Sequence, residues 1–168
     1  VDADGFNAFD SPNCSHLLSA GIHIEMNTQF PPLPDLKAIS NLTPATACTD
    51  DLVVSPIKSQ PIGMLSLYPG ISSSVLTNII QQPVNALILL SYGVGNAPQN
   101  ATLLRQIEQA NKNGIIVVNC TQCMRGRVNM SGYANGKYVE ETGLVSSKDI
   151  PPEAALANLH YLLSKPDL

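Results

Sequence analysis

A loop with two glycines is the first stretch whose residues could do chemistry. The sequence SYGVGNAPQN (91–100) directly follows the apolar run NALILL (85–90). A dinucleotide-binding fingerprint reads G-x-G-x-x-G, and its third glycine lets the following helix pack closely on the strand. Gly93 and Gly95 fit the first two positions, but Pro98 occupies the third. The loop is therefore not predicted to bind a dinucleotide. Taken alone, it predicts a turn in which the glycines and Asn96 adopt positive φ.

The cysteines raise the question of a metal or redox site. The chain has four cysteines and three histidines, and CTQC (120–123) is a single C-x-x-C pair. A structural zinc site needs four ligands at recognisable spacings, and a redox motif needs its first cysteine at a helix start. Cys120 instead follows the apolar run IIVV (115–118) and Asn119. We therefore expect no metal, and we expect Cys120 and Cys123 to be buried free thiols in a reducing cytoplasm.

Composition limits the classes of partner. The chain has 168 residues, of which 44% are hydrophobic, enough for one domain with a core and an appendage. Its net charge is −4 and it has no basic block. Nucleic acid and anionic membranes are therefore poor partners. No apolar run approaches the roughly 20 residues that a membrane-spanning helix needs.

Strands and helices alternate in the second half of the chain. Short apolar segments at 62–69, 85–93 and 115–120 predict buried strands. Apolar residues at helical spacing predict helices over 71–82, 100–114 and 151–165. The ends of these helices carry suitable residues. Serines and Asn100 can cap the starts of the first two helices, Gly114 follows the end of the second, and prolines begin the third. His160, on the last of these helices, is expected to be structural.

Strands that are apolar on both faces and separated by helices indicate a parallel sheet covered on both sides. The predicted fold class is α/β: a three-layer α/β/α domain with a mainly parallel, Rossmann- or flavodoxin-like sheet, preceded by an N-terminal tail and linker. Right-handed crossovers place the loops that follow the strands along one edge, where ligands bind in such sheets. The loops 68–74, 91–100 and 120–130 should therefore meet and form the site.

The first part of the chain has weaker patterns. Ile22, Ile24 and Met26 alternate with polar residues, which predicts a strand within 21–30. The proline- and threonine-rich segment 31–51 is predicted to be a linker. Residues 52–60 are predicted to form an edge strand interrupted by Pro56.

Four stretches, in order, resemble one known family. They are ADGFNAFDSPN (3–13), QPIGMLSLYPGIS (60–72), LLSYGVGNAPQN (89–100) and VVNCTQC with GRVNMSGYANG (117–136). Together they resemble the C-terminal half of bacterial type I, cytoplasmic L-asparaginases. The segment from about Gln29 to Asp51 is longer than the linker of that family. The resemblance implies a remnant of an N-terminal domain at 1–27, a linker with an insertion at 28–61 and a C-terminal α/β domain at 62–168.

The resemblance also implies where catalysis takes place. In that family a nucleophilic threonine in a T-G-G-T-type motif, a Thr-Asp pair in a G-T-D-T-type motif and a lysine act together in the N-terminal domain. Neither motif occurs in this sequence, and the chain is expected to begin just after the lysine. We therefore expect the parent enzyme to hydrolyse L-asparagine, and this chain to hold no catalytic residue, to need no cofactor and to be inactive alone. The implied partners are the N-terminal domain and further copies in a homo-oligomer.

Binding residues follow from the same resemblance, because family members use these loops to shape substrate and effector pockets. The implied substrate- or effector-binding residues are Tyr92, Gly93, Gly95, Asn96, Asn119, Thr121 and Cys123. For Asn119, a backbone-capping role is an equal alternative. Some members bind asparagine in a separate regulatory pocket and carry an arginine where this chain has Leu90. A guanidinium binds a carboxylate through paired hydrogen bonds and leucine cannot, so Arg125 and Arg127 are the nearby candidates for that role.

The sequence alone leaves other functions open. The domain could be a stand-alone amino-acid-binding or dimerisation module, or it could belong to a related glutamyl-tRNA amidotransferase subunit. A receiver-like signalling domain is not supported, because Tyr68 and Pro69 stand where acidic residues would be needed. The preference of the parent enzyme for asparagine or glutamine also stays open.

Overall fold

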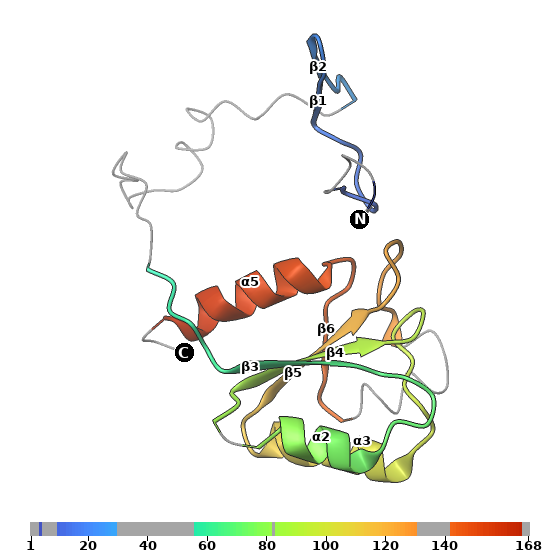
Figure 1. The fold of residues 1–168 in the computed structure, drawn as a ribbon, viewed down its shortest axis with the longest axis vertical. Coiled ribbons are helices and arrows are strands. Elements are labelled where there is room, and N and C mark those ends of the chain that lie inside the picture. The colour runs from blue at the N-terminus through green and yellow to red at the C-terminus, as the bar shows by residue number, and fades with distance from the viewer. Residues whose placement is uncertain (1–3, 5–9, 30–55, 82, 131–141, 166–168) are drawn as a thin grey trace, which may run out of the picture. The chain divides into compact units, whose positions relative to one another are not determined.

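The computed structural model describes residues 4, 10–29, 56–81, 83–130 and 142–165. The chain divides into two compact units, Val1–Ser55 and Pro56–Leu168, which are drawn in Figure 1. The predicted domain boundaries at residues 27 and 61 remain predictions.

The first unit contains a β-hairpin. Strand β1 (Leu18–Ala20) pairs antiparallel with β2 (Ile24–Met26), with Leu18 opposite Met26. The expected alternation from Ile22 onward was wrong at its start, because Ile22 lies in the turn and is 98% exposed. The N–H of Gly21 donates to the carbonyl of His23 at 3.0 Å and closes this turn. A period-two pattern cannot show where a turn ends and a strand begins.

The second unit contains a four-stranded parallel sheet. Its strands are β3 (Ile62–Ser66), β4 (Ala86–Ser91), β5 (Ile116–Thr121) and β6 (Val145–Ser146). They lie in the order β3-β4-β5-β6, and every neighbouring pair is parallel. The three predicted strands are confirmed, whereas the two-residue β6 has no apolar run to predict it. Among these strands the spatial order follows the chain order without a reversal.

Helices α2 (Ser73–Ile79), α3 (Ala101–Lys112) and α5 (Pro152–Leu163) confirm the three predicted helices. The Ser72 hydroxyl accepts a hydrogen bond from the N–H of Ser74, and the Asn100 side chain accepts from the first turn of α3. Gly114 has φ +85° just beyond α3, as the C′ position requires. In the described part of the chain, no helix is long and apolar enough to cross a membrane.

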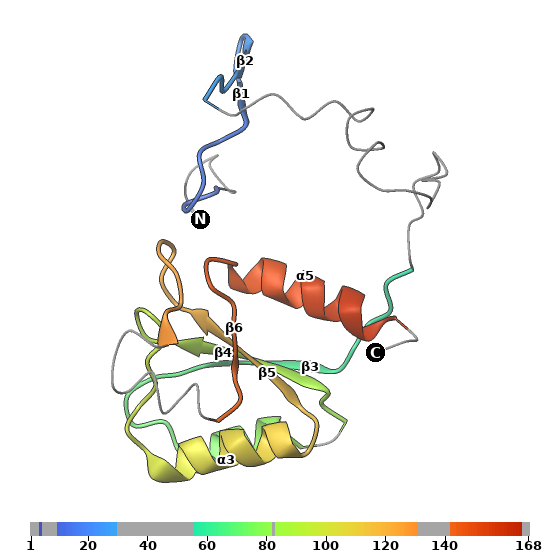
Figure 2. The same cartoon turned by 180° about the vertical axis from the view of Figure 1, so that it is seen from behind.

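The helices cover both faces of the sheet, as Figures 1 and 2 show. Leu87 and Leu89 of β4 belong to the cluster that includes Leu76 of α2 and Leu103 and Ile107 of α3. The alternate residues Ala86 and Ile88 pack in a second cluster with Ala155 and Leu159 of α5. Alternation along β4 thus sends side chains to opposite layers, and the three-layer prediction is confirmed.

The segment before β3 differs from the prediction of an edge strand over 52–60. Residues 52–55 lie outside the described residues, and 56–60 form no strand. The N–H of Lys58 donates to Ser164 Oγ at 2.8 Å, and the N–H of Gln60 donates to His160 Nδ1 at 3.1 Å. Because side chains at the end of α5 bind these backbone donors, the segment joins the helix rather than a sheet. This contact confirms a structural role for His160.

Candidate functional site

The loop after β4 is closed by its own backbone. Tyr92 N–H donates to the carbonyl of Asn96 at 2.9 Å, and the N–H groups of Gly95 and Asn96 both donate to the carbonyl of Tyr92 at 2.9 Å. Gly93 and Gly95 have φ +48° and +110°. Such values are strained for residues with a side chain, so the predicted positive φ is present at both glycines. The prediction was wrong for Asn96, whose φ is not positive, because the two glycines already provide the positive φ values of this turn.

Gly95 is also needed because of its neighbours. A Cβ at this position would lie 2.7 Å from Val128 Cγ1 and 3.2 Å from Asn119 Nδ2. Val128 is buried in the core cluster under α2 and α3, so it has little room to move. A Cβ on Gly93 would meet nothing within 4 Å. The loop therefore lies against the core at Gly95 and faces open space at Gly93.

Residues at the end of β5 hold this loop in place. Asn119 is fully buried, and its Nδ2 donates to the carbonyl of Gly95 at 3.1 Å. The Thr121 hydroxyl donates to the carbonyl of Gly93 and accepts from the N–H of Cys123 at 3.0 Å. The contact that the structure shows for Asn119 is thus the backbone-capping one, since its side chain binds a backbone carbonyl. Its Oδ1 is buried and bonds to no described residue.

Gln122 joins the carboxyl ends of β3, β4 and β5. Its Nε2 donates to the carbonyls of Leu67 at 2.7 Å and Leu90 at 2.8 Å, and its N–H donates to the carbonyl of Ser91 at 3.0 Å. Leu67 N–H also donates to the carbonyl of Leu90 at 2.9 Å. The strand ends that carry the three predicted loops therefore lie at one edge, and the loops after β4 and β5 also meet, because Asn129 N–H donates to the carbonyl of Val94 at 2.7 Å. Sequence reasoning missed Gln122, because a lone glutamine has no spacing that indicates such a role.

The side chains of the loop after β4 and of the strand before it differ in how accessible they are to a ligand. Asn96 is half-buried, and none of the described residues hydrogen-bonds with its amide, so within this part of the chain its donors and its acceptor are free. Tyr92 packs against the core, and its buried hydroxyl finds no partner within the described segments. Leu90 packs against the cluster under α5.

The two cysteines of CTQC have different environments. Cys120 is a buried free thiol, as predicted, but Cys123 is exposed, so that part of the prediction was wrong. The reason is that β5 ends at Thr121, which leaves Cys123 in the loop beyond the sheet. Burial raises the pKa of the Cys120 thiol, and the neighbouring Ser147 hydroxyl opposes this effect. Cys120 is therefore a neutral thiol near pH 7 and a poor nucleophile.

The hydroxyl groups at this edge are bound to the backbone. Ser91 Oγ donates to the carbonyl of Cys120 at 3.0 Å, and Thr121 donates to Gly93 as described above. A serine or threonine nucleophile needs an adjacent base, and no described histidine or carboxylate hydrogen-bonds with either hydroxyl. Within the described residues, no group of three or more His, Cys, Asp or Glu side chains could hold a metal ion.

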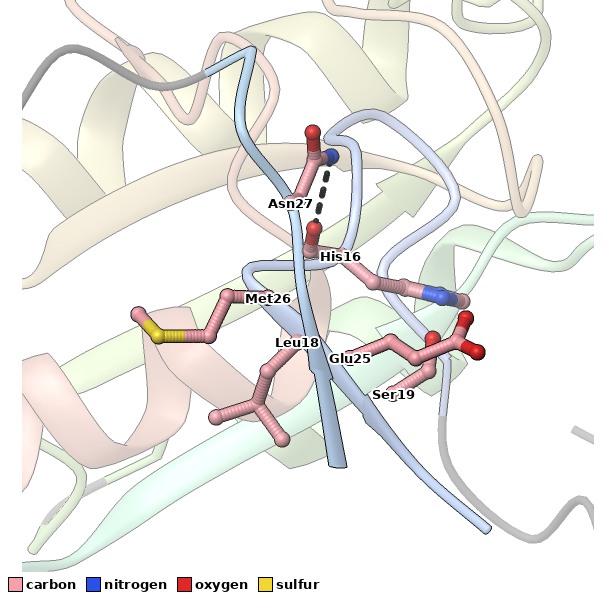
Figure 3. Close-up of a pocket in the computed structure, with 6 residues that line it drawn as sticks. All are labelled: His16, Leu18, Ser19, Glu25, Met26 and Asn27. Carbon is pink, nitrogen blue, oxygen red and sulfur yellow. Dashed lines mark hydrogen bonds between the residues drawn. The ribbon is translucent and has the colours of Figure 1, made fainter. Parts of the chain in front are cut away.

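A hollow of about 300 Å³ lies on the hairpin of the first unit. Its lining residues are His16, Leu18, Ser19, Glu25, Met26 and Asn27. Figure 3 shows Leu18 and Met26 on one side and Ser19 and Glu25 on the other, with Asn27 Nδ2 donating to the His16 carbonyl at 2.9 Å. All but Asn27 are exposed. Ligand pockets bury most of their ligand, so we do not regard this open hollow as the functional site.

Comparison with known families identifies the second unit. Residues 61–167 match the glutaminase/asparaginase C-terminal domain family. The chain belongs to this family. The match covers the whole parallel sheet and α2, α3 and α5, so the edge formed by Tyr92–Asn96 and Asn119–Cys123 lies in an asparaginase C-terminal domain.

The likeness to asparaginases extends beyond that domain. L-asparaginase 1 of Escherichia coli (strain K12) is 51% identical over 164 residues, which are 97% of this chain and 44% of that protein. The crystal structure of L-asparaginase I from Vibrio cholerae O1 biovar eltor str. N16961 is 49% identical with a TM-score of 0.82, over 99% of this chain and 46% of that chain. The chain thus spans less than half the length of these relatives.

A less similar relative matches a smaller part of the chain. A glutamyl-tRNA(Gln) amidotransferase component of Methanococcus maripaludis is 32% identical over 113 residues, or 67% of this chain and 27% of that protein. The two asparaginases named above are more similar and match nearly the full chain, so the asparaginase interpretation fits better than the amidotransferase one.

Proposed function

We propose that the parent protein hydrolyses L-asparagine to L-aspartate and ammonia, and that this chain supplies pocket-forming loops rather than the catalytic groups. The observation that carries the proposal is the 51% identity to an L-asparaginase over 97% of the chain. The loops at the sheet edge are the parts of this chain that such a pocket would use, since ligands bind at the carboxyl ends of parallel strands.

The chain alone is proposed to be inactive. Its sequence contains neither a T-G-G-T nor a G-T-D-T motif. The hydroxyls of Ser91 and Thr121 donate to backbone carbonyls rather than to a base. Without an activated nucleophile, binding groups alone would not cleave an amide at a useful rate.

The proposed substrate- or effector-binding residues are Tyr92, Gly93, Gly95, Asn96, Asn119, Thr121 and Cys123. Asparagine carries a carboxylate, an ammonium and an amide, so its pocket needs both donors and acceptors. Asn96 offers both, and the exposed Cys123 is joined to the same loop through Thr121 and Gly93. The buried Asn119 and the glycines would act by fixing the shape of the loop.

Leu90 affects the affinity expected of this pocket. A leucine cannot bind a carboxylate through paired hydrogen bonds as an arginine does. Arg125 and Arg127 are exposed in the loop after β5 and remain the proposed anion partners. We expect weaker effector binding than in relatives with an arginine at this position.

The N-terminal hairpin supports a role for a further domain. Leu18, Ile24 and Met26 lie on one face of it and are 51%, 74% and 76% exposed. An isolated two-stranded hairpin is marginally stable in water. We propose that an N-terminal asparaginase domain covers this apolar face, that 1–27 belongs with that domain, and that 28–61 is the linker.

We further propose that the parent protein is a type I, cytoplasmic asparaginase and a homo-oligomer. The free thiols of Cys14, Cys120 and Cys123 are in keeping with a cytoplasmic location.

Calorimetric titration of the chain with L-asparagine, with ammonia release followed in parallel, tests the proposal. We expect weak binding and no ammonia. Replacing Asn96 by alanine should lower the affinity about tenfold, as expected for one or two lost hydrogen bonds. The matched control is Asn158→Ala on the exposed side of α5, which should bind like the unchanged chain.

Each outcome of this titration is informative. Ammonia release would contradict the proposed absence of catalytic groups. Binding that Asn96→Ala leaves unchanged would place the ligand elsewhere. Absence of binding would mean that the loops need the N-terminal domain to form a pocket, and a parallel titration with L-glutamine would show which amide is preferred.

A further inference from the structure

Strand β3 forms one edge of the described sheet. Leu67 N–H donates to the carbonyl of Leu90 on β4, and the carbonyl of Pro61 accepts from Asn85 N–H. Backbone groups alternate in direction along a strand. The odd-numbered residues of β3 therefore bond to β4, and the N–H and C=O groups of Ile62, Met64 and Ser66 point away from the sheet.

These outward groups have few partners. Ile62 N–H bonds back to the carbonyl of Gln60 at 2.9 Å, whereas the backbones of Met64 and Ser66 hydrogen-bond with no residue in the described segments. Met64 is also 44% exposed. Unpaired strand edges promote pairing between chains, and proteins usually protect them with lysine, proline, bulges or short strands. Residues 62–66 contain neither lysine nor proline, whereas the opposite edge, β6, has only two residues.

The β3 edge is complementary to itself. If two copies meet antiparallel about a two-fold axis through Met64, each Met64 exchanges its N–H and C=O bonds with Met64 of the other copy. Ser66 N–H of each copy then donates to the free carbonyl of Ile62 on the other. Residues 59–71 carry no charge, so no repulsion arises at the axis, and the two exposed Met64 side chains come together.

We propose that β3 is a dimer interface, at which a second copy of this chain adds its own β3 antiparallel and extends the sheet across a two-fold axis. Such an interface uses the same patch on both subunits. The inference deepens the proposed self-association by naming the strand. It does not depend on asparagine binding.

Sedimentation velocity over a range of concentrations tests the interface. The unchanged chain should dimerise. Met64→Lys places two like charges at the axis and should raise the dimer dissociation constant at least about 100-fold, since like charges brought together in an interface strongly oppose association. The matched control is Val145→Lys on the opposite edge strand, where the side chain is 53% exposed, and it should change the constant less than about threefold.

A second variant, Ser66→Pro, tests the interface independently in case Met64→Lys does not fold. Ser66→Pro removes an outward N–H but no bond to β4, and proline is tolerated at such edge positions. It should weaken the dimer while urea unfolding of the monomer stays cooperative. A monomeric unchanged chain would overturn both the interface and the proposed self-association. A dimer that survives Met64→Lys, or that Val145→Lys weakens equally, would overturn the β3 interface alone.

Cross-linking provides a direct geometric check. Directly opposed residues in a hydrogen-bonded antiparallel pair have Cα atoms about 5.5 Å apart, which a disulfide can span. In a chain with Cys14, Cys48 and Cys123 replaced by serine, Met64→Cys should form a covalent dimer with oxidised glutathione. Val145→Cys in the same background should not, and a reversed result would refute the interface.

Discussion

The two faces of the sheet are covered to different degrees. On the face under α2 and α3, Leu65 of the edge strand β3 is 6% exposed, and Leu87 and Leu89 are fully buried. On the face under α5, the central residues Ala86 and Ile88 are equally buried, but Met64 on β3 and Val145 on β6 are 44% and 53% exposed. Among the helices that the structure describes, only α5 covers the middle of this second face, and Met64 and Val145 at its margins stay exposed.

This difference shows that coverage depends on the connections between strands. Right-handed crossovers between β3 and β4 and between β4 and β5 place α2 and α3 on the same face. Only α5, which follows β6, packs on the other face among the described helices. Parallel sheets are usually covered on both faces, so the exposed margins beside β3 and β6 are the least covered parts of this face in the described part of the chain.

The largest expected effect compares neighbouring residues of β3 that point to opposite faces. Leu65→Ala should lower the free energy of unfolding by about 3 kcal/mol, because it removes buried methyl groups and leaves a cavity. Met64→Ala should lower it by less than about 1 kcal/mol, because the side chain is nearly half exposed. Urea unfolding at concentrations where the protein is monomeric measures both values. Equal losses would show that the two faces are equally packed.

A somewhat smaller effect is expected where the β4 loop meets the α2/α3 face. Gly95→Ala should cost about 2 kcal/mol, since the new Cβ combines positive φ with a contact to the buried Val128. Gly93→Ala, in open space, should cost about 1 kcal/mol from the backbone alone. Urea unfolding of the two variants checks the difference. If Gly93→Ala proved the costlier change, the close approach of Gly95 to the core would not limit the loop.

The smallest expected change in stability concerns the α5 face. Burial raises the pKa of Cys120, so the folded state holds its proton more tightly than the unfolded state. This contribution is fully present at neutral pH and is lost as pH rises past about 8 to 9, where an unperturbed thiol ionises. Urea unfolding at neutral and at alkaline pH should therefore show a shallower loss of stability with rising pH for Cys120→Ala than for the unchanged chain.

Thiol labelling at pH 7 gives an independent measure of the same difference. Cys123 is exposed and should react at least about 100-fold faster than Cys120, which becomes accessible only when the structure opens. Rapid labelling of Cys120 in the folded protein would mean that the α5 face opens readily.

The sequence allowed much of the second unit to be predicted, for local reasons. Runs such as IIVV (115–118) have few alternatives to a buried strand, and Asn100 and Gly114 have side-chain and backbone properties that suit helix ends. The hairpin was only partly predicted, because alternation does not locate the turn at Ile22. The short β6 was missed, since two residues carry no pattern and its pairing depends on β5.

The candidate site was predictable as loops but not as contacts. The order of strands and helices determined that the loops after β3, β4 and β5 would share an edge. Only the tertiary structure decided that Asn119 binds the carbonyl of Gly95, that Gln122 joins three strand ends, and that Cys123 is exposed while Cys120 is buried. Local patterns follow from neighbours along the chain, whereas these contacts link residues 24 to 55 positions apart or depend on where a strand ends. Such contacts form only when the layers of the domain pack together.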